Sequence, residues 1–182
     1  EANIDLDVGS VDGLNLKVGY FTTIVGAETY NYNANAFHSR SFGFQVEPTH
    51  HTGILGSYTV SESIEIQFGV ANDSTTAVIN SGDDNDPLTT GDSDSTLFMG
   101  SLKYTLPELP VLGGASLYYA VINGAGADTN EVDNHYVSLE NLALGVEGLT
   151  YKLAIDWTDK DVGADSTIIG HYLSYAINDK VT

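Results

Sequence analysis

The chain has 182 residues and a formal charge of −19, from 25 acidic groups against six Lys plus Arg, and it has no cysteine. Six cations cannot neutralise a run of phosphates, so we expect no nucleic-acid partner. The absence of cysteine excludes disulfides and cysteine-ligated metals. No uncharged apolar stretch reaches the roughly 18 to 20 residues of a membrane-spanning helix, so only a barrel could span a bilayer.

The chain opens with two segments in which apolar and polar residues alternate. Residues 2–8 alternate apolar side chains with polar ones such as Asp5 and Asp7, and residues 14–20 repeat the pattern after a glycine-containing turn. A period of two is typical of β-strands that have one apolar and one polar face. These segments predict an antiparallel hairpin.

Seven further segments continue the design, at residues 52–60, 64–71, 96–106, 115–122, 135–146, 149–158 and 167–177. The total is about nine strands of roughly 7 to 12 residues, lengths that suit tilted strands crossing a bilayer. In the segment 135–146, Leu139 and Leu142 are an odd number of residues apart, so a regular strand would place these two apolar side chains on opposite faces. We expect a β-bulge near Asn141.

The connections between these segments alternate between short and long. Short turns lie at 9–13, 61–63, 107–114 and 147–148, and long loops at 23–51, 72–95, 123–134 and 159–166. This alternation is typical of an all-β, antiparallel up-and-down transmembrane β-barrel. A further wall strand at residues 42–46 would break this alternation of short and long connections. We therefore expect this apolar segment to fold within the first long loop and not to be a strand of the barrel wall. We expect residues 1–182 to form a single β-barrel domain in which residues 23–51 fold inward as a constriction loop.

Two architectures fit the alternating faces. In a soluble β-sandwich or lipocalin-like barrel the apolar face points inward, whereas in a membrane barrel it points outward to lipid. The polar face mixes glycine, serine and charge, which suits a wet lumen. Aromatic residues recur near strand ends on the apolar face, as in an interfacial girdle: Tyr20, Tyr58, Tyr104, Tyr151 and Trp157. The sequence favours the membrane barrel, and the soluble sandwich stays open.

Charged residues fall into two groups in such a barrel. Those of the polar face are expected to face the lumen: Asp5, Asp7, Lys17, Glu65, Lys103, Lys152 and Asp156. Aspartates of one long loop are expected to form an acidic outer mouth: Asp83, Asp84, Asp86, Asp92 and Asp94. An acidic mouth concentrates cations within a screening length of about 8 to 10 Å, although surface acids that merely keep a loop solvated are the plainer alternative. The acidic loops lack the EF-hand pattern, so we expect no cofactor and at most incidental calcium.

The first long loop holds a cluster of titratable residues: Glu28, His38, Arg40, Glu47, His50 and His51. Histidine beside carboxylates raises the hypothesis of a metal or acid–base site. The histidine spacings do not match the i, i+4 zinc pattern, and the sequence contains neither a nucleophile elbow nor a phosphate-binding glycine motif. We expect no metal site and no enzyme, with an outer-membrane hydrolase as a minor alternative. We expect these side chains instead to point into the lumen and narrow it.

Three blocks near the start of the chain carry a family resemblance. They are Leu-Asn-Leu-Lys-Val-Gly-Tyr-Phe-Thr-Thr from Leu14 with Gly26-Ala27-Glu28, then Phe37-His38-Ser39-Arg40-Ser41-Phe42, then Glu47-Pro48-Thr49-His50-His51-Thr52-Gly53. They resemble the OmpL-like β-barrel porin family of Gram-negative outer membranes, in which an "lkvGkf…G.E" strand precedes an "fSrS" segment and a "P.thtG" turn. Tyr20 departs from the pattern, because a basic residue often stands there.

The resemblance implies an outer-membrane porin without a cofactor, through which small solutes and ions diffuse passively. It places the matched positions in the inward loop and its return to the wall: Glu28, Ser39, Arg40, Ser41, Pro48, Thr49, His50, Thr52 and Gly53. The expected partners are outer-membrane lipid, solutes and ions, with a homo-oligomer left open, and the expected preference is for cations. The alternative is a structural or adhesive surface barrel whose lumen is plugged.

Strand number adds one further expectation. Porins of this kind are longer, and an odd set of strands leaves an edge whose peptide groups are unpaired in lipid. We therefore expect the chain to be an incomplete part of a larger barrel.

Overall fold

The computed structural model describes residues 2–35, 37–72, 96–107, 114–125 and 132–177. Within them the elements follow in the order β1(Ala2–Asp7), β2(Leu14–Thr22), η1(Tyr32–Ala34), α1(Phe42–Val46), β3(His50–Ser61), β4(Ile64–Asn72), β5(Thr96–Thr105), β6(Ser116–Ala125), β7(Val132–Ala143), β8(Leu149–Lys160) and β9(Ser166–Tyr175). None of the helices in these ranges has the length and apolar character needed to cross a membrane.

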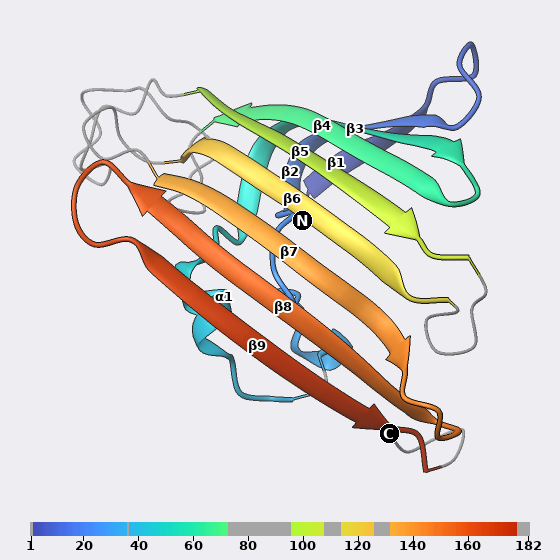
Figure 1. Cartoon of the computed structure of the whole chain (residues 1–182). Coiled ribbons are helices and arrows are strands. Elements are labelled where there is room, and N and C mark those ends of the chain that lie inside the picture. Colours follow the sequence, from blue (N-terminus) through green and yellow to red (C-terminus); the bar gives the residue numbers. More distant parts are fainter. Residues whose placement is uncertain (1, 36, 73–95, 108–113, 126–131, 178–182) are drawn as a thin grey trace.

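The strands form one antiparallel sheet in which each strand pairs with the next along the chain, from β1 to β9. Figure 1 shows them side by side in chain order in a strongly curved sheet. Among the described residues β1 and β9 do not pair with each other, so the sheet is open. The predicted all-β, antiparallel up-and-down architecture is confirmed, with nine strands in one open sheet among the described residues.

The two faces of the sheet differ as the alternation predicted. Phe68, Phe98 and Leu173 expose 53%, 58% and 64% of their surface on the outer face. On the opposite face Leu97 and Met99 are buried under the loop that joins β2 to β3. An apolar outer face is the surface that lipid solvates in a membrane barrel. The soluble sandwich, which needs these outer side chains in a packed centre, does not describe this sheet.

Strand β7 contains the predicted bulge. Its pairing register with β8 shifts between Leu139 and Leu142, and Asn141 has a φ of 57°. Asparagine adopts this left-handed conformation more readily than most residues with a side chain. The register shift keeps Leu139 and Leu142 on the same face of the sheet, opposite Leu153 and Tyr151 of β8. The predicted β-bulge near Asn141 is confirmed.

The apolar piece 42–46 forms helix α1 inside the first long loop, in agreement with strand parity. The Ser41 side chain begins the helix by accepting a hydrogen bond from the backbone N–H of Phe44 at 3.4 Å. The extended backbone of Glu47 ends it. Strand β3 begins at His50, so the segment that leaves the wall spans residues 23–49 rather than 23–51.

Candidate functional site

The described residues of the segment 23–49, called the inward loop below, lie against the inner face of the sheet. Three wall side chains hold its backbone. The Tyr118 hydroxyl of β6 donates to the Ile24 carbonyl at 2.6 Å, and Asn134 of β7 donates to the Val46 carbonyl at 3.1 Å. Lys152 of β8 donates to the Ala27 carbonyl at 3.3 Å. Both ends of the loop are therefore attached to strands far from its own in the sequence.

The first residues of the inward loop also pack into an apolar cluster. Ile24 and Val25 are buried, together with Phe21 at the end of β2. The wall contributes the other buried members: Leu55, Ala71, Leu97, Met99, Ala120, Ile122, Tyr136 and Ala154. Burial of this apolar surface favours a loop that stays inside the curve of the sheet.

Arg40 organises the middle of the inward loop. Its guanidinium donates to the Thr29 carbonyl at 2.5 Å and to the Tyr30 carbonyl at 2.6 Å. A Glu28 oxygen lies 3.8 Å from the same group, and the Glu28 carboxylate accepts the Ser41 backbone N–H at 3.1 Å. The Arg40 and Glu28 side chains are only 13% and 9% exposed. The two charges therefore compensate each other within the loop, and their hydrogen bonds hold residues 28–30 next to residues 40–41.

Two carboxyl groups meet where the end of the inward loop touches the wall. Glu47, which follows α1, shares a side-chain hydrogen bond with Asp156 of β8. Burial, this hydrogen bond and the nearby charges of Asp156 and Glu28 raise the pKa of Glu47 from 4.5 to about 9, against a lowering by Lys152. Near neutral pH the pair therefore holds a proton.

Two glycines make room for the Glu47 carboxyl. A side chain on Gly26, whose φ is +104°, would collide with the Glu47 carboxyl oxygens. A Cβ on Gly43 in α1 would lie 3.0 Å from the Asp156 Oδ2 atom and 3.4 Å from the Glu47 Oε1 atom. The carboxyl pair therefore lies close to the loop backbone at both glycines.

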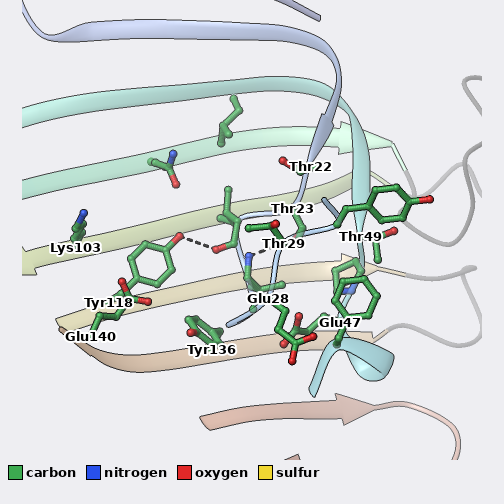
Figure 2. Close-up of a pocket in the computed structure, with 18 of the residues that line it drawn as sticks. Thr22, Thr23, Glu28, Thr29, Glu47, Thr49, Lys103, Tyr118, Tyr136 and Glu140 are labelled. Atoms are coloured by element: carbon green, nitrogen blue, oxygen red, sulfur yellow. Dashed lines mark hydrogen bonds between the residues drawn. The ribbon is translucent and has the colours of Figure 1, made fainter. Parts of the chain in front are cut away.

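A cavity of about 380 Å³ lies between the inward loop and strands β2 to β7 (Figure 2). Figure 2 shows Tyr118 pointing from the wall to the loop and Glu47 beside the helix on the loop side. The wall side of the cavity carries opposite charges: Lys17, Glu65, Lys103 and Glu140. The cavity is thus a polar space bounded by strand side chains on one side and the loop on the other.

Two of these four wall charges, Lys17 and Glu140, have ion-pair partners in the described part of the chain. Lys17 lies 3.8 Å from Asp5, and Lys152 lies 2.8 Å from Glu140. Lys103 faces Glu65 in the register of β4 and β5 but has no carboxylate within 4.0 Å in the described part of the chain. Lys103 and Glu65 are therefore the two wall charges of the cavity without an ion pair in the described part of the chain.

A row of uncharged polar side chains also crosses the inner face. Gln67 of β4 donates to the Ser57 hydroxyl at 3.1 Å and accepts from the Ser101 hydroxyl at 2.9 Å. The residues predicted to face the lumen do not include Gln67, Tyr118 or Asn134, although the alternation places Gln67 on the polar face of its strand. Gln67 and Asn134 share a face with the charged residues Glu65 and Glu140 of their strands, and that is the signal that could have found them. Tyr118 shares its face of β6 with Ala120 and Ile122, so its strand carries no such signal.

The histidines of the first loop do not converge. His38 lies on the exposed outer part of the loop near Tyr32, and Ser39 beside it is exposed. His50 stacks on Tyr20 with ring centroids 4.8 Å apart. His51 is buried in β3, with its Nε2 atom 3.0 Å from the Thr23 hydroxyl. Among the described residues there is no group of three or more potential ligands for a metal ion.

The remaining predicted charges lie in two places. The acidic mouth residues fall at 83–94, outside the described residues. Asp7 lies at the end of β1, opposite Asn15. At the long-loop ends of β7, β8 and β9 a hollow of about 220 Å³ is lined by acidic residues and one lysine: Asp133, Asp159, Lys160, Asp161 and Asp165.

The outer face carries ordered aromatic contacts. His135 of β7 stacks on Trp157 of β8 with ring centroids 4.9 Å apart, and its Nδ1 atom lies 3.1 Å from the Tyr119 hydroxyl of β6. Tyr151 and His171 form a similar pair, with hydroxyl and Nδ1 atoms 2.6 Å apart. Amphipathic rings of this kind are enriched where a membrane barrel meets the lipid headgroups.

A curved antiparallel sheet with an apolar outer face, a polar inner face and a loop folded against that inner face defines a β-barrel wall of the membrane type. The family model "Putative beta-barrel porin-2, OmpL-like" matches residues 1–182, the whole chain. The protein therefore belongs to the OmpL-like β-barrel porin family, as its sequence blocks predicted. No curated protein and no solved structure matches it.

Proposed function

We propose that this protein forms a water-filled channel in the bacterial outer membrane, through which small solutes and ions diffuse passively. The observation that carries the proposal is the position of residues 23–49. They lie on the polar face of the sheet, and a polar cavity of about 380 Å³ remains between them and the wall. Family membership and the exposed apolar outer face support the same function.

We further propose that the inward loop narrows this channel. Its attachments come from β6, β7 and β8, so it crosses the inner face rather than lying over the rim. A segment held by wall strands at several points keeps a defined shape, which a size-selective passage needs. The channel needs no cofactor and no catalytic group, and its partners are lipid, solutes and ions.

A cation preference follows from the charge balance. The net charge is −19. The hollow at the long-loop ends is mainly acidic, with Asp133, Asp159, Asp161 and Asp165 around Lys160. A negative field at the entrance raises the local concentration of cations and is screened by salt.

Reconstitution in planar bilayers tests these proposals. We expect stepwise currents with a reversal potential that indicates cation preference, and that preference should fade as the salt concentration approaches about 1 M, where the screening length is about 3 Å. Protein that inserts into the bilayer but carries no current would refute the channel. If the cation preference does not change with salt concentration, the acidic residues at the entrance are not its cause.

One observation favours a second function, a structural or adhesive barrel with a plugged lumen. The start of the inward loop is packed into the apolar cluster, with Ile24 and Val25 buried against the wall. Tight packing of this kind could fill the lumen. Silent bilayers despite complete insertion are the result that this alternative predicts.

A further inference from the structure

The end of the inward loop is held to the wall by a contact whose strength depends on a proton. Glu47 belongs to the loop and Asp156 to β8, and their carboxyl groups share a hydrogen bond. Two carboxylates cannot donate to each other, so one of them must be protonated for this contact to form. The contact lies next to the 3.1 Å hydrogen bond from Asn134 to the Val46 carbonyl.

We propose that the Glu47–Asp156 carboxyl pair is a proton-operated latch, which holds the inward loop against β8 while protonated and loosens it when the proton is lost. Loss of the proton replaces a hydrogen bond by repulsion between two negative charges in a partly buried place. Gly26 and Gly43 of the loop lie close to the pair, so this repulsion acts between the loop and β8.

The charged and titratable groups around Glu47 do not cancel this effect. On the loop, Glu28 adds a negative charge, and it is itself engaged by Arg40. On β8, Lys152 favours ionised Glu47, but it is paired with Glu140 of β7 at 2.8 Å. The Tyr136 side chain of β7 and the Tyr172 side chain of β9 also interact with Glu47 and are neutral near pH 7.

The direction of the pH effect follows from proton binding. The docked loop binds the proton more tightly than a free loop, whose glutamate titrates at its ordinary pKa of 4.5. Docking is therefore strongest below that value and weakens as the pH rises from 4.5 towards about 9, where docked Glu47 loses its proton. The latch is closed on the acidic side and open on the alkaline side.

A spin label on α1 measures docking directly. The chain contains no cysteine, and Phe42 is 78% exposed, so Phe42→Cys gives a single attachment site that leaves the loop contacts in place. In proteoliposomes we expect the mobile fraction of the label to rise at least about twofold between about pH 6 and pH 10. No change over this range would overturn the latch.

Two variants assign the response to the carboxyl pair. In Glu47→Gln and in Asp156→Asn an amide donates to the remaining carboxylate without a titratable proton, so the label should stay immobile throughout. Glu62→Gln, in the exposed turn between β3 and β4, is the matched control and should keep the full response. A pH response that survives in whichever amide variant folds would refute the latch.

Any effect of the latch on conductance rests on the proposed channel function, whereas the label reports loop docking alone. A channel that conducts while the label shows no response refutes the latch and keeps the channel. A label that responds in a protein without current supports the latch and refutes the channel.

Discussion

The guanidinium carbon of Arg40 lies 4.2 Å from the centroid of the Tyr32 ring. The same carbon lies 4.1 Å from the Phe44 ring of α1, so one cation joins the helix to the preceding part of the loop. Contacts of a cation with aromatic faces are stronger in places that exclude water, and Arg40 is largely buried. Arg40 is the sole arginine of the chain. We infer that Arg40 fixes the shape of the inward loop through these contacts.

Replacing Arg40 by methionine should therefore loosen the inward loop. The change removes two hydrogen bonds to backbone carbonyls and leaves Glu28 buried without its cation, at a cost of roughly 2 to 4 kcal/mol in loop docking. We expect cleavage within residues 23–49 to accelerate in limited proteolysis, while the strands stay protected. Lys160→Met, which removes a cation outside the loop, is the control. Equal cleavage rates for wild type and Arg40→Met would contradict this role.

Gly26→Ala should displace the end of the inward loop. A Cβ at Gly26 would overlap the Glu47 carboxyl, and a φ of +104° is unfavourable for alanine by roughly 1 to 3 kcal/mol. Gly163→Ala separates the two causes, because Gly163 has a φ of +110° but a Cβ added to it would meet no atom within 4 Å. Denaturation in detergent should show a larger loss of stability for Gly26→Ala. Equal losses would mean that the contact with Glu47 is unimportant.

Tyr118→Phe should weaken the attachment of the loop to β6. It removes the hydrogen bond to the Ile24 carbonyl, worth about 1 kcal/mol, and leaves that carbonyl without this donor. Tyr119→Phe is a close control, because the Tyr119 hydroxyl contacts His135 on the outer face. We expect current noise from loop motion to increase only in Tyr118→Phe. The same noise in both variants would argue against a loop attachment at this residue.

Lys103→Gln should increase the preference of the channel for cations. Removing a unit charge about 8 Å from a passing ion changes its energy by about 1 kcal/mol at an effective dielectric constant of about 40, or roughly fivefold in relative permeability. Reversal potentials at low salt measure this change. Lys103→Arg keeps the charge and should behave as wild type. A shift in both variants would point to altered packing instead.

The sequence predicts the wall far better than the site. Strand β4 could be found because Ile64, Ile66, Phe68 and Val70 repeat with the period of a strand, and the bulge at Asn141 because that period breaks there. Both signals are local, and each strand pairs with its neighbour in the chain.

The loop contacts carry no such local signal. Tyr118 and Ile24 are 94 positions apart, and Asn134 and Val46 are 88 apart. The carboxyl pair joins Glu47 to a wall residue that the sequence placed on the inner face without a partner. These pairings depend on the curvature of the sheet, which the alternation of residue types does not specify.

The orientation of the sheet is the central claim, and neighbouring residues of β4 test it most directly. Gln67 lines the cavity, whereas Phe68 is 53% exposed on the outer face. Because the chain has no cysteine, Gln67→Cys and Phe68→Cys each place one thiol in the reconstituted protein. We predict that a membrane-impermeant thiol reagent modifies Gln67→Cys, and that only a lipid-soluble reagent reaches Phe68→Cys. The reverse pattern would contradict a lipid-facing apolar surface and, with it, the channel.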